Sequence, residues 1–210
     1  MVFFVISAVI LRYIFQFQFV SLWLMLLVFI SMLWHVIAQQ KGTKKAAADF
    51  AITIGGAAYL GCLGSYAISI RNMDNGLYWL LLTLPIISFA DTGAYLIGRA
   101  FGKHKMLSVV SPKKSWEGFY FGLAGAIGSF FLFRELFLEF LTPVDALVLG
   151  LIVGVFGPMG DLVESLLKRD AGTKDSSNLL AGHGGFFDRF DSVIASAPVV
   201  YIYLQNFIKF

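Results

Sequence analysis

The sequence predicts an all-α, polytopic membrane protein with about six transmembrane helices, or seven if residues 1–15 also cross the bilayer. Hydrophobic residues make up 58% of the 210-residue chain and charged residues only 14%, whereas about a quarter of the residues in a soluble domain are charged. Most apolar residues fall into runs of roughly 20, the length that crosses a bilayer as a helix. We therefore expect one membrane-embedded domain over residues 1–210.

Residues 1–45 are expected to supply the N-terminal spans. Arg12 interrupts the first apolar run after about ten residues, so this run predicts a tilted or partial helix. The run over residues 16–38 is long enough to cross and ends at the hydrophilic segment QQKGTKK. The third run, residues 46–70, is rich in Gly and Ala, which allow helices to pack closely in a bilayer. We interpret that run as structural.

Four further apolar runs cover residues 77–97, 117–141, 144–167 and 190–207. Asp91 lies near the end of the first of them. Charged side chains in membrane segments are rare and usually functional. Asp91 is therefore a candidate site residue.

The run over residues 144–167 contains Gly157-Pro158, which is expected to kink the helix, followed by Asp161. Glu164 and Lys168 come three and seven positions later, on the same helical face. The arrangement can be interpreted as an intrahelical ion pair or as a metal site that uses Asp161. A carboxylate inside the membrane beside a proline kink favours the metal ligand.

Residues 165–192 carry a high density of charge of both signs. The ionisable residues of this segment are Lys168, Arg169, Asp170, Lys174, Asp175, His183, Asp188, Arg189 and Asp191. Carboxylates bind a hard cation such as Mg²⁺, while Lys and Arg neutralise phosphate oxygens. Gly182, Gly184 and Gly185 let backbone N–H groups approach an anion. The segment therefore predicts a phosphate and metal site.

The order of these residues resembles that of a known family. Ser165-x-x-Lys168-Arg169 is followed by Lys174-Asp175 and by His183-Gly184-Gly185-x-x-Asp188-Arg189-x-Asp191. This pattern is similar to that of the phosphatidate cytidylyltransferases, or CDP-diacylglycerol synthases, and the resemblance begins at about Asp91. Ala181 departs from the family's Pro or Gly, which affects only the local turn. The chain is also shorter than typical bacterial members, a difference expected to lie in N-terminal membrane segments.

The resemblance implies transfer of a cytidylyl group from CTP to phosphatidic acid, giving CDP-diacylglycerol and pyrophosphate. Residues 91–192 would carry the site. The expected catalytic residues are Asp161, Lys168, Arg169, Lys174, Asp175, His183, Asp188, Arg189 and Asp191. The expected metal ligands are Asp161, Asp175, Asp188 and Asp191. They would hold Mg²⁺, and a second cation such as K⁺ stays open.

The segment Ser111–Gly118, SPKKSWEG, has two interpretations. A basic loop bounded by proline can hold nucleotide phosphates, or it can only fix orientation and touch anionic lipid. Its similarity to a second conserved region of the family favours the first. The expected substrate-binding residues are Asp91, Ser111, Lys113, Lys114 and Ser115.

The basic residues also predict the orientation in the membrane. Twelve of the 16 Lys and Arg residues lie in segments 39–46, 99–116 and 168–189, which alternate with segments that have few. The positive-inside rule places these three segments in the cytoplasm, so the site is expected on the cytoplasmic face of the cell (inner) membrane. The expected partners are CTP, phosphatidic acid and the lipid bilayer. A homodimer stays open, and no nucleic-acid partner is expected.

Three other functions remain open from the sequence. A CTP-dependent kinase acting on polyprenol or phytol would give CDP and a lipid phosphate. A transporter or channel would spread its charged residues through the depth of the bilayer, whereas these residues cluster at one interface. An inactive homologue would keep the fold without the reaction.

Overall fold

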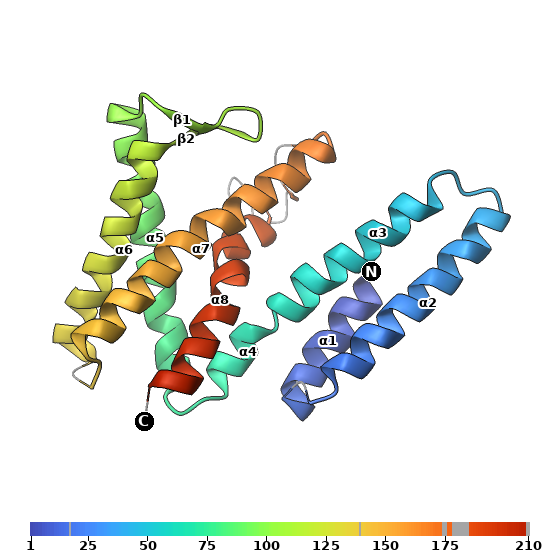
Figure 1. The fold of residues 1–210 in the computed structure, drawn as a ribbon, viewed down its shortest axis with the longest axis horizontal. Helices are drawn as coiled ribbons and strands as arrows, with labels where there is room; N and C mark the ends of the chain where they lie inside the picture. The colour runs from blue at the N-terminus through green and yellow to red at the C-terminus, as the bar shows by residue number, and fades with distance from the viewer. Residues whose placement is uncertain (17, 139, 174–175, 178–184, 209–210) are drawn as a thin grey trace.

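A computed structural model describes residues 1–16, 18–138, 140–173, 176–177 and 185–208. Helices dominate these ranges, and the two strands form a single small sheet (Figure 1). The elements are α1 (Val2–Phe15), α2 (Val20–Gln40), α3 (Ala46–Gly56), the π-helix η1 (Ala57–Leu63), α4 (Tyr66–Arg71), α5 (Gly76–Phe101), β1 (Lys105–Leu107), β2 (Ser111–Ser115), α6 (Trp116–Phe137), α7 (Pro143–Asp170) and α8 (Phe187–Phe207).

The predicted class, an all-α polytopic membrane protein, is confirmed. Five helical segments are long and apolar enough to cross a membrane: α2, the continuous segment Ala46–Arg71, α5, α6 and α7. They match the first five expected spans. α8 covers the sixth, although it is less apolar than the other five. α1 is an apolar helix of 14 residues, the short helix expected at the N-terminus.

The main core lies among α5, α6, α7 and α8. Its largest fully buried side chains include Trp79, Ile86, Phe130, Leu149 and Leu204, which come from all four helices. In Figure 1 these helices form one group, α1 to α3 form another, and α4 connects them. The group of α5 to α8, together with the hairpin that connects α5 to α6, carries every site residue predicted from the sequence that the structure describes.

The N-terminal helices have a smaller core of their own. It is formed by Phe4, Ala8, Trp23, Leu27 and Ala57. Next to it, Arg12 of α1 is only 4% exposed. Its guanidinium carbon lies 3.9 Å from the ring centroid of Tyr66 in α4. This cation–π contact links the short first helix to the span Ala46–Arg71.

The site-bearing helices begin at side-chain caps. Thr142 and Asp145 form a reciprocal capping box at the start of α7, with Pro143 in the first helical position, where its missing N–H costs nothing. The Ser115 hydroxyl accepts a hydrogen bond from the backbone N–H of Gly118 at the start of α6. Ser115 therefore ends β2 and caps the helix that follows.

Glycines allow the site-bearing helices to approach closely. A Cβ atom at Gly160 of α7 would overlap the carbonyl oxygen of Asp191 in α8. A Cβ at Gly118 of α6 would meet the carbonyl oxygen of Ala94 in α5 at 2.5 Å. Small residues at these crossings let the backbones touch. The backbones of α7 and α8 therefore meet beside the carboxylates that both helices carry.

The segment between α5 and α6 is a β-hairpin, where the sequence predicted only a loop. β1 and β2 pair antiparallel, with Lys105 opposite Ser115 and Leu107 opposite Ser111. At the base of the hairpin, the backbone N–H of Trp116 donates to the carbonyl of His104 at 3.0 Å. The Glu117 carboxylate accepts from the backbone N–H of His104 at 3.2 Å and lies 2.6 Å from its ring. The hairpin is therefore fixed to the first turn of α6.

The three basic segments lie at one end of the molecule. The α2–α3 connection, the hairpin and the C-terminal end of α7 all lie toward the top of Figure 1, and the α4–α5 and α6–α7 connections lie at the opposite end. This agrees with the alternation read from the sequence. It brings the hairpin and the charged end of α7 to the same end of the molecule.

Candidate active site between the hairpin, α7 and α8

A cavity of about 260 Å³ lies between the hairpin, α5, α6 and α7. The five residues that the sequence predicted for substrate binding all line it. They are Asp91, Ser111, Lys113, Lys114 and Ser115. Asp91 lies within α5, ten residues before its end, because the helix continues past the apolar run to Phe101. The hairpin and α5 thus bring together residues that are about 20 positions apart.

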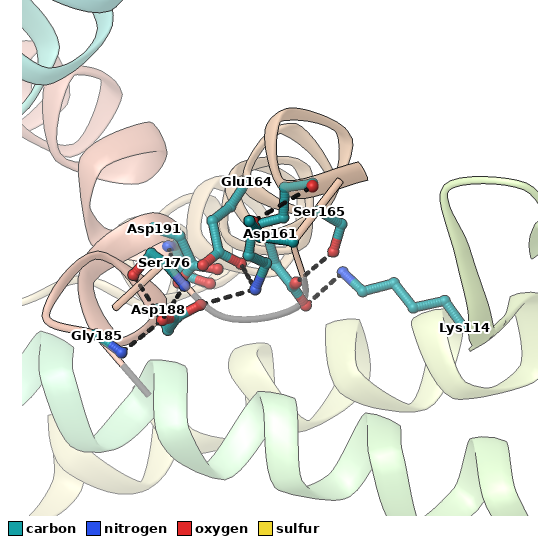
Figure 2. A network of polar contacts seen from close by, with 11 residues as sticks. Lys114, Asp161, Glu164, Ser165, Ser176, Gly185, Asp188 and Asp191 are labelled. Atoms are coloured by element: carbon teal, nitrogen blue, oxygen red, sulfur yellow. Dashed lines mark hydrogen bonds and ion pairs between the residues drawn. The ribbon is translucent and has the colours of Figure 1, made fainter. Parts of the chain in front are cut away.

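Lys114 joins this cavity to α7. Its ammonium lies 2.8 Å from the carboxylate of Asp161 and donates to the carbonyl oxygen of Pro158 at 3.0 Å (Figure 2). Asp161 also lines the cavity, and its second carboxylate oxygen accepts a weak hydrogen bond from the Ser165 hydroxyl at 3.4 Å. A basic residue of the hairpin and an acidic residue of α7 therefore face the same space.

Asp161 also belongs to a cluster of three carboxylates. Oxygen atoms of Asp161, Glu164 and Asp191 all lie within 4.8 Å of one another. Glu164 is 2% exposed and Asp191 7% exposed. The Oε1 atom of Glu164 has no hydrogen-bond partner among the described residues. Buried carboxylates this close repel one another unless positive charge lies between them, so the set suits a hard divalent cation with oxygen ligands.

Lys168 supplies positive charge on the other side of Glu164. Its ammonium lies 2.7 Å from Glu164 Oε2 and 2.7 Å from Asp188 Oδ1. An ion pair along α7, one of the two interpretations of this helix, is therefore present between Glu164 and Lys168. Figure 2 shows Lys114 and Asp161 at one side of the network and Asp188 at the other. The polar network thus extends from the hairpin across α7 to the start of α8.

Asp188 ties the α7–α8 connection to α8. Its Oδ2 atom accepts hydrogen bonds from the backbone N–H and hydroxyl of Ser176, at 3.1 and 2.6 Å, and from the backbone N–H of Gly185 at 2.6 Å. Through these hydrogen bonds Asp188 organises the described part of this connection.

The remaining predicted site residues lie in α8, at the end of α7 or outside the described residues. Asp188 and Asp191 both lie in the first two turns of α8, as expected. Arg169 is exposed at the end of α7, and Arg189 is exposed in α8. Lys174, Asp175 and His183 lie outside the described residues. The predicted metal role of Asp175 therefore has no structural counterpart here.

Sequence reasoning missed two residues near the cluster. Glu164 was interpreted only as an ion-pair partner, since its spacing to Lys168 is that of an intrahelical pair. Tyr59 lies in η1, inside the run assigned a structural role. Its ring packs edge-on against Phe187 at 6.0 Å, and its buried hydroxyl has no hydrogen-bond partner among the described residues. The Tyr59 hydroxyl interacts electrostatically with the carboxylates of Asp191 and Glu164. In addition, π-helical turns often occur at functional sites.

The arrangement can bind an anion and a cation side by side. Lys113 and Lys114 offer ammonium groups to the cavity, and phosphate oxygens are natural partners for such groups. The carboxylate cluster lies next to the cavity because Asp161 belongs to both. This is the arrangement that phosphate chemistry with a metal ion needs.

Comparison with known proteins identifies the family. A family profile described as "Cytidylyltransferase family" matches residues 1–207, which extends beyond the C-terminal 60% where the motif resemblance was found. A phosphatidate cytidylyltransferase from Bacillus subtilis (strain 168) is 40% identical over 152 residues, covering 72% of this chain and 56% of the relative. One from Staphylococcus epidermidis (strain ATCC 12228) is 41% identical over 157 residues, covering 74% and 59%.

A more distant relative covers more of the chain. The phosphatidate cytidylyltransferase of Mycobacterium tuberculosis (strain H37Rv) is 34% identical over 188 residues, which is 85% of this chain and 57% of the relative. The chain thus spans somewhat more than half the length of these curated relatives. Because the family profile matches nearly the whole chain, from the first helix to the end of α8, the chain belongs to the cytidylyltransferase family.

Proposed function

We propose that the protein transfers a cytidylyl group from CTP to phosphatidic acid, giving CDP-diacylglycerol and pyrophosphate. The observation that carries the proposal is the sharing of Asp161 between the lysine-lined cavity and the carboxylate cluster. Membership of the cytidylyltransferase family supports it. So does the printed function of the relatives, which are phosphatidate cytidylyltransferases.

The reaction asks for positioning and charge neutralisation rather than a side-chain nucleophile. An oxygen of the lipid phosphate attacks the α-phosphorus of CTP. The bond from that phosphorus to the bridging oxygen breaks, and pyrophosphate leaves with the electron pair. Lys113 and Lys114 would hold phosphate oxygens in the cavity, and Lys168 would limit repulsion between the carboxylates and the reacting phosphates.

The donor set fits Mg²⁺. Asp161, Glu164 and Asp191 would hold the ion, because their oxygens converge and one oxygen of Glu164 is buried without a protein partner among the described residues. When bound, the ion would neutralise charge that develops on phosphate oxygens. The roles of Asp175 and Asp188 as further ligands, and of a second cation such as K⁺, stay predictions.

The site is proposed to face the cytoplasm. Three basic segments lie at the site's end of the molecule (Figure 1). The positive-inside rule favours the cytoplasmic side for such segments, and CTP is made and used there. A homodimer stays a prediction.

The decisive experiment offers the purified protein two labelled forms of CTP in lipid vesicles. With phosphatidic acid and Mg²⁺, label on the α-phosphorus should enter the lipid and label on the γ-phosphorus should leave as pyrophosphate. Entry of γ-label into added polyprenol or phytol would instead identify the lipid kinase. Failure of α-label to enter lipid at any Mg²⁺ concentration, in protein that remains folded, would refute the proposed reaction.

A further inference from the structure

The hairpin between α5 and α6 has a part that lines the cavity and a part that is exposed. Residues 102–116 contain four lysines and one histidine but no acidic residue. In β1, Met106 lines the cavity, whereas its neighbours Lys105 and Leu107 are exposed. The residues paired with them across the hairpin, Ser115 and Ser111, line the cavity. One part of the hairpin therefore closes the cavity, while the side chains of Lys105 and Leu107 stay exposed.

The outward face combines positive charge with exposed apolar side chains. Val109, at the turn, is 89% exposed and Leu107 is 44% exposed. Lys103 and Lys105, which precede Leu107 and Val109 in the chain, are also exposed. We call these four residues the outer hairpin face. An apolar tip with flanking lysines suits the boundary between the hydrocarbon and the phosphate groups of a bilayer.

The position of the hairpin places it close to that boundary. It connects the end of one span, α5, directly to the start of the next, α6. Trp116 and Tyr120, at the start of α6, are exposed and their rings stack with centroids 6.0 Å apart. Exposed Trp and Tyr gather at the level of the lipid headgroups. In Figure 1 the hairpin extends sideways from the ends of α5 and α6, across their axes.

The direction of the hairpin is fixed by its base. Glu117 holds the backbone and ring of His104, and Trp116 is hydrogen-bonded to the His104 carbonyl. Lys114 fixes the other strand to α7 through Asp161. The outer hairpin face therefore has a defined orientation, which a loosely attached loop would lack.

We propose that the outer hairpin face rests on the membrane and binds its anionic headgroups. Leu107 and Val109 enter the interfacial layer, and Lys103 and Lys105 contact lipid phosphates. The lysines of the hairpin thus divide into two sets. Lys113 and Lys114 line the cavity, while Lys103 and Lys105 serve the bilayer.

The depth of the tip in the membrane tests the proposal. In a Cys62→Ala background, Val109→Cys is spin-labelled and the protein is placed in vesicles of neutral phosphatidylcholine, with or without anionic phosphatidylglycerol. The label at 109 should be more accessible to oxygen than to a water-soluble nickel complex, and the difference should grow in anionic vesicles. Asp74→Cys, exposed at the opposite end, should report an aqueous position in both. Equal nickel accessibility at positions 109 and 74 would overturn the proposal.

Charge variants test the role of the lysines separately. In Lys103→Gln/Lys105→Gln, the extra depth gained in anionic vesicles should disappear, whereas Lys103→Arg/Lys105→Arg should keep it. Persistence of the lipid-dependent depth in the Gln variant would refute the assigned headgroup contact. The spin label reports membrane depth and needs no CTP turnover. The membrane contact can therefore be refuted while the proposed reaction stands, and the reaction can be refuted while the membrane contact stands.

Discussion

The ammonium of Lys168 contacts two carboxylates, of Glu164 and Asp188, at equal distances of 2.7 Å. Glu164 therefore serves two environments. Its Oε2 atom contacts Lys168, one of its oxygens belongs to the carboxylate cluster, and its Oε1 atom has no partner among the described residues. One residue thus joins the cation-binding candidates to the ion pair that anchors α8. The chemistry of the site depends on which oxygen of Glu164 each neighbour uses.

Removing charge at the cluster should weaken use of Mg²⁺. We expect Asp161→Asn and Glu164→Gln each to lower activity at ordinary Mg²⁺ by at least about tenfold, because each removes an anionic ligand while keeping the shape. Initial rates measured across a Mg²⁺ titration would show the requirement moving to higher concentration. Asp170→Asn, exposed at the end of the same helix, is the matched control and should behave as the unmodified protein. Unchanged Mg²⁺ dependence in both cluster variants would remove these residues from the metal site.

At the residue scale, the sequence predicted much of the polar site. Asp161, Lys168, Asp188 and Asp191 were identified because charge inside an apolar sequence is conspicuous. Glu164 was missed because the sequence shows its spacing to Lys168 but not its burial. Tyr59 gave no signal, since an aromatic residue in an apolar run is usually interpreted as packing.

At the scale of elements, the sequence predicted the long helices and missed the short, irregular pieces. Runs of about 20 apolar residues specify spans directly, and the bounds of α5 and α7 exceed the predicted runs because polar turns continue each helix. The π-helix η1 depends on a shift in backbone hydrogen bonding that no residue pattern in the run records. The hairpin was missed because β1 has three residues and β2 contains Pro112.

The crossing of α7 and α8 should be sensitive to one methyl group. Gly160→Ala would press a Cβ atom against the backbone of Asp191, so we expect a loss of stability of about 1–3 kcal/mol and a displaced Asp191. Thermal unfolding in detergent and the reaction rate would both fall. Gly128→Ala in α6 is the control, because a Cβ there meets no atom within 4 Å. A Gly160→Ala variant as stable and active as the control would contradict the packing described.

The hairpin lysines should separate by kinetic effect. Lys113→Ala and Lys114→Ala are expected to raise KM for CTP, lower kcat, or both, by roughly tenfold or more, the loss of a hydrogen bond to a charged group. The dependence on phosphatidic acid should change little. Lys103→Ala, on the outer hairpin face, provides the comparison and should leave KM for CTP near its original value. Unaltered kinetics in the Lys113→Ala/Lys114→Ala double variant would leave these lysines a structural role only.

At the scale of the whole molecule, alternation of basic and non-basic connections predicted which segments share an end. The structure places the hairpin, the end of α7 and the α2–α3 connection toward the same end (Figure 1), so this part of the topology follows from counting spans and charges. The partition into two helix groups could not be predicted. The partition depends on how buried side chains such as Arg12 and Trp79 pack between neighbouring helices, which composition does not encode.

The orientation can be measured with single cysteines in a Cys62→Ala background. Thr43→Cys and Ala171→Cys, in exposed connections at the site's end, should resist a membrane-impermeant thiol reagent in intact cells. Asp74→Cys should react. Permeabilised cells supply the control, in which all three should be labelled. Labelling of positions 43 and 171 in intact cells would place the site on the outer face, away from CTP.

The contact between Lys114 and Asp161 has a consequence for the order in which ligands add. The Asp161 oxygen that lies 2.8 Å from the Lys114 ammonium cannot serve the ammonium and a divalent ion equally, since the two positive charges would repel. Arrival of the ion at the carboxylates would release the ammonium toward the cavity, ready for a triphosphate. If the carboxylates hold Mg²⁺, binding of the metal before the nucleotide would therefore be favoured.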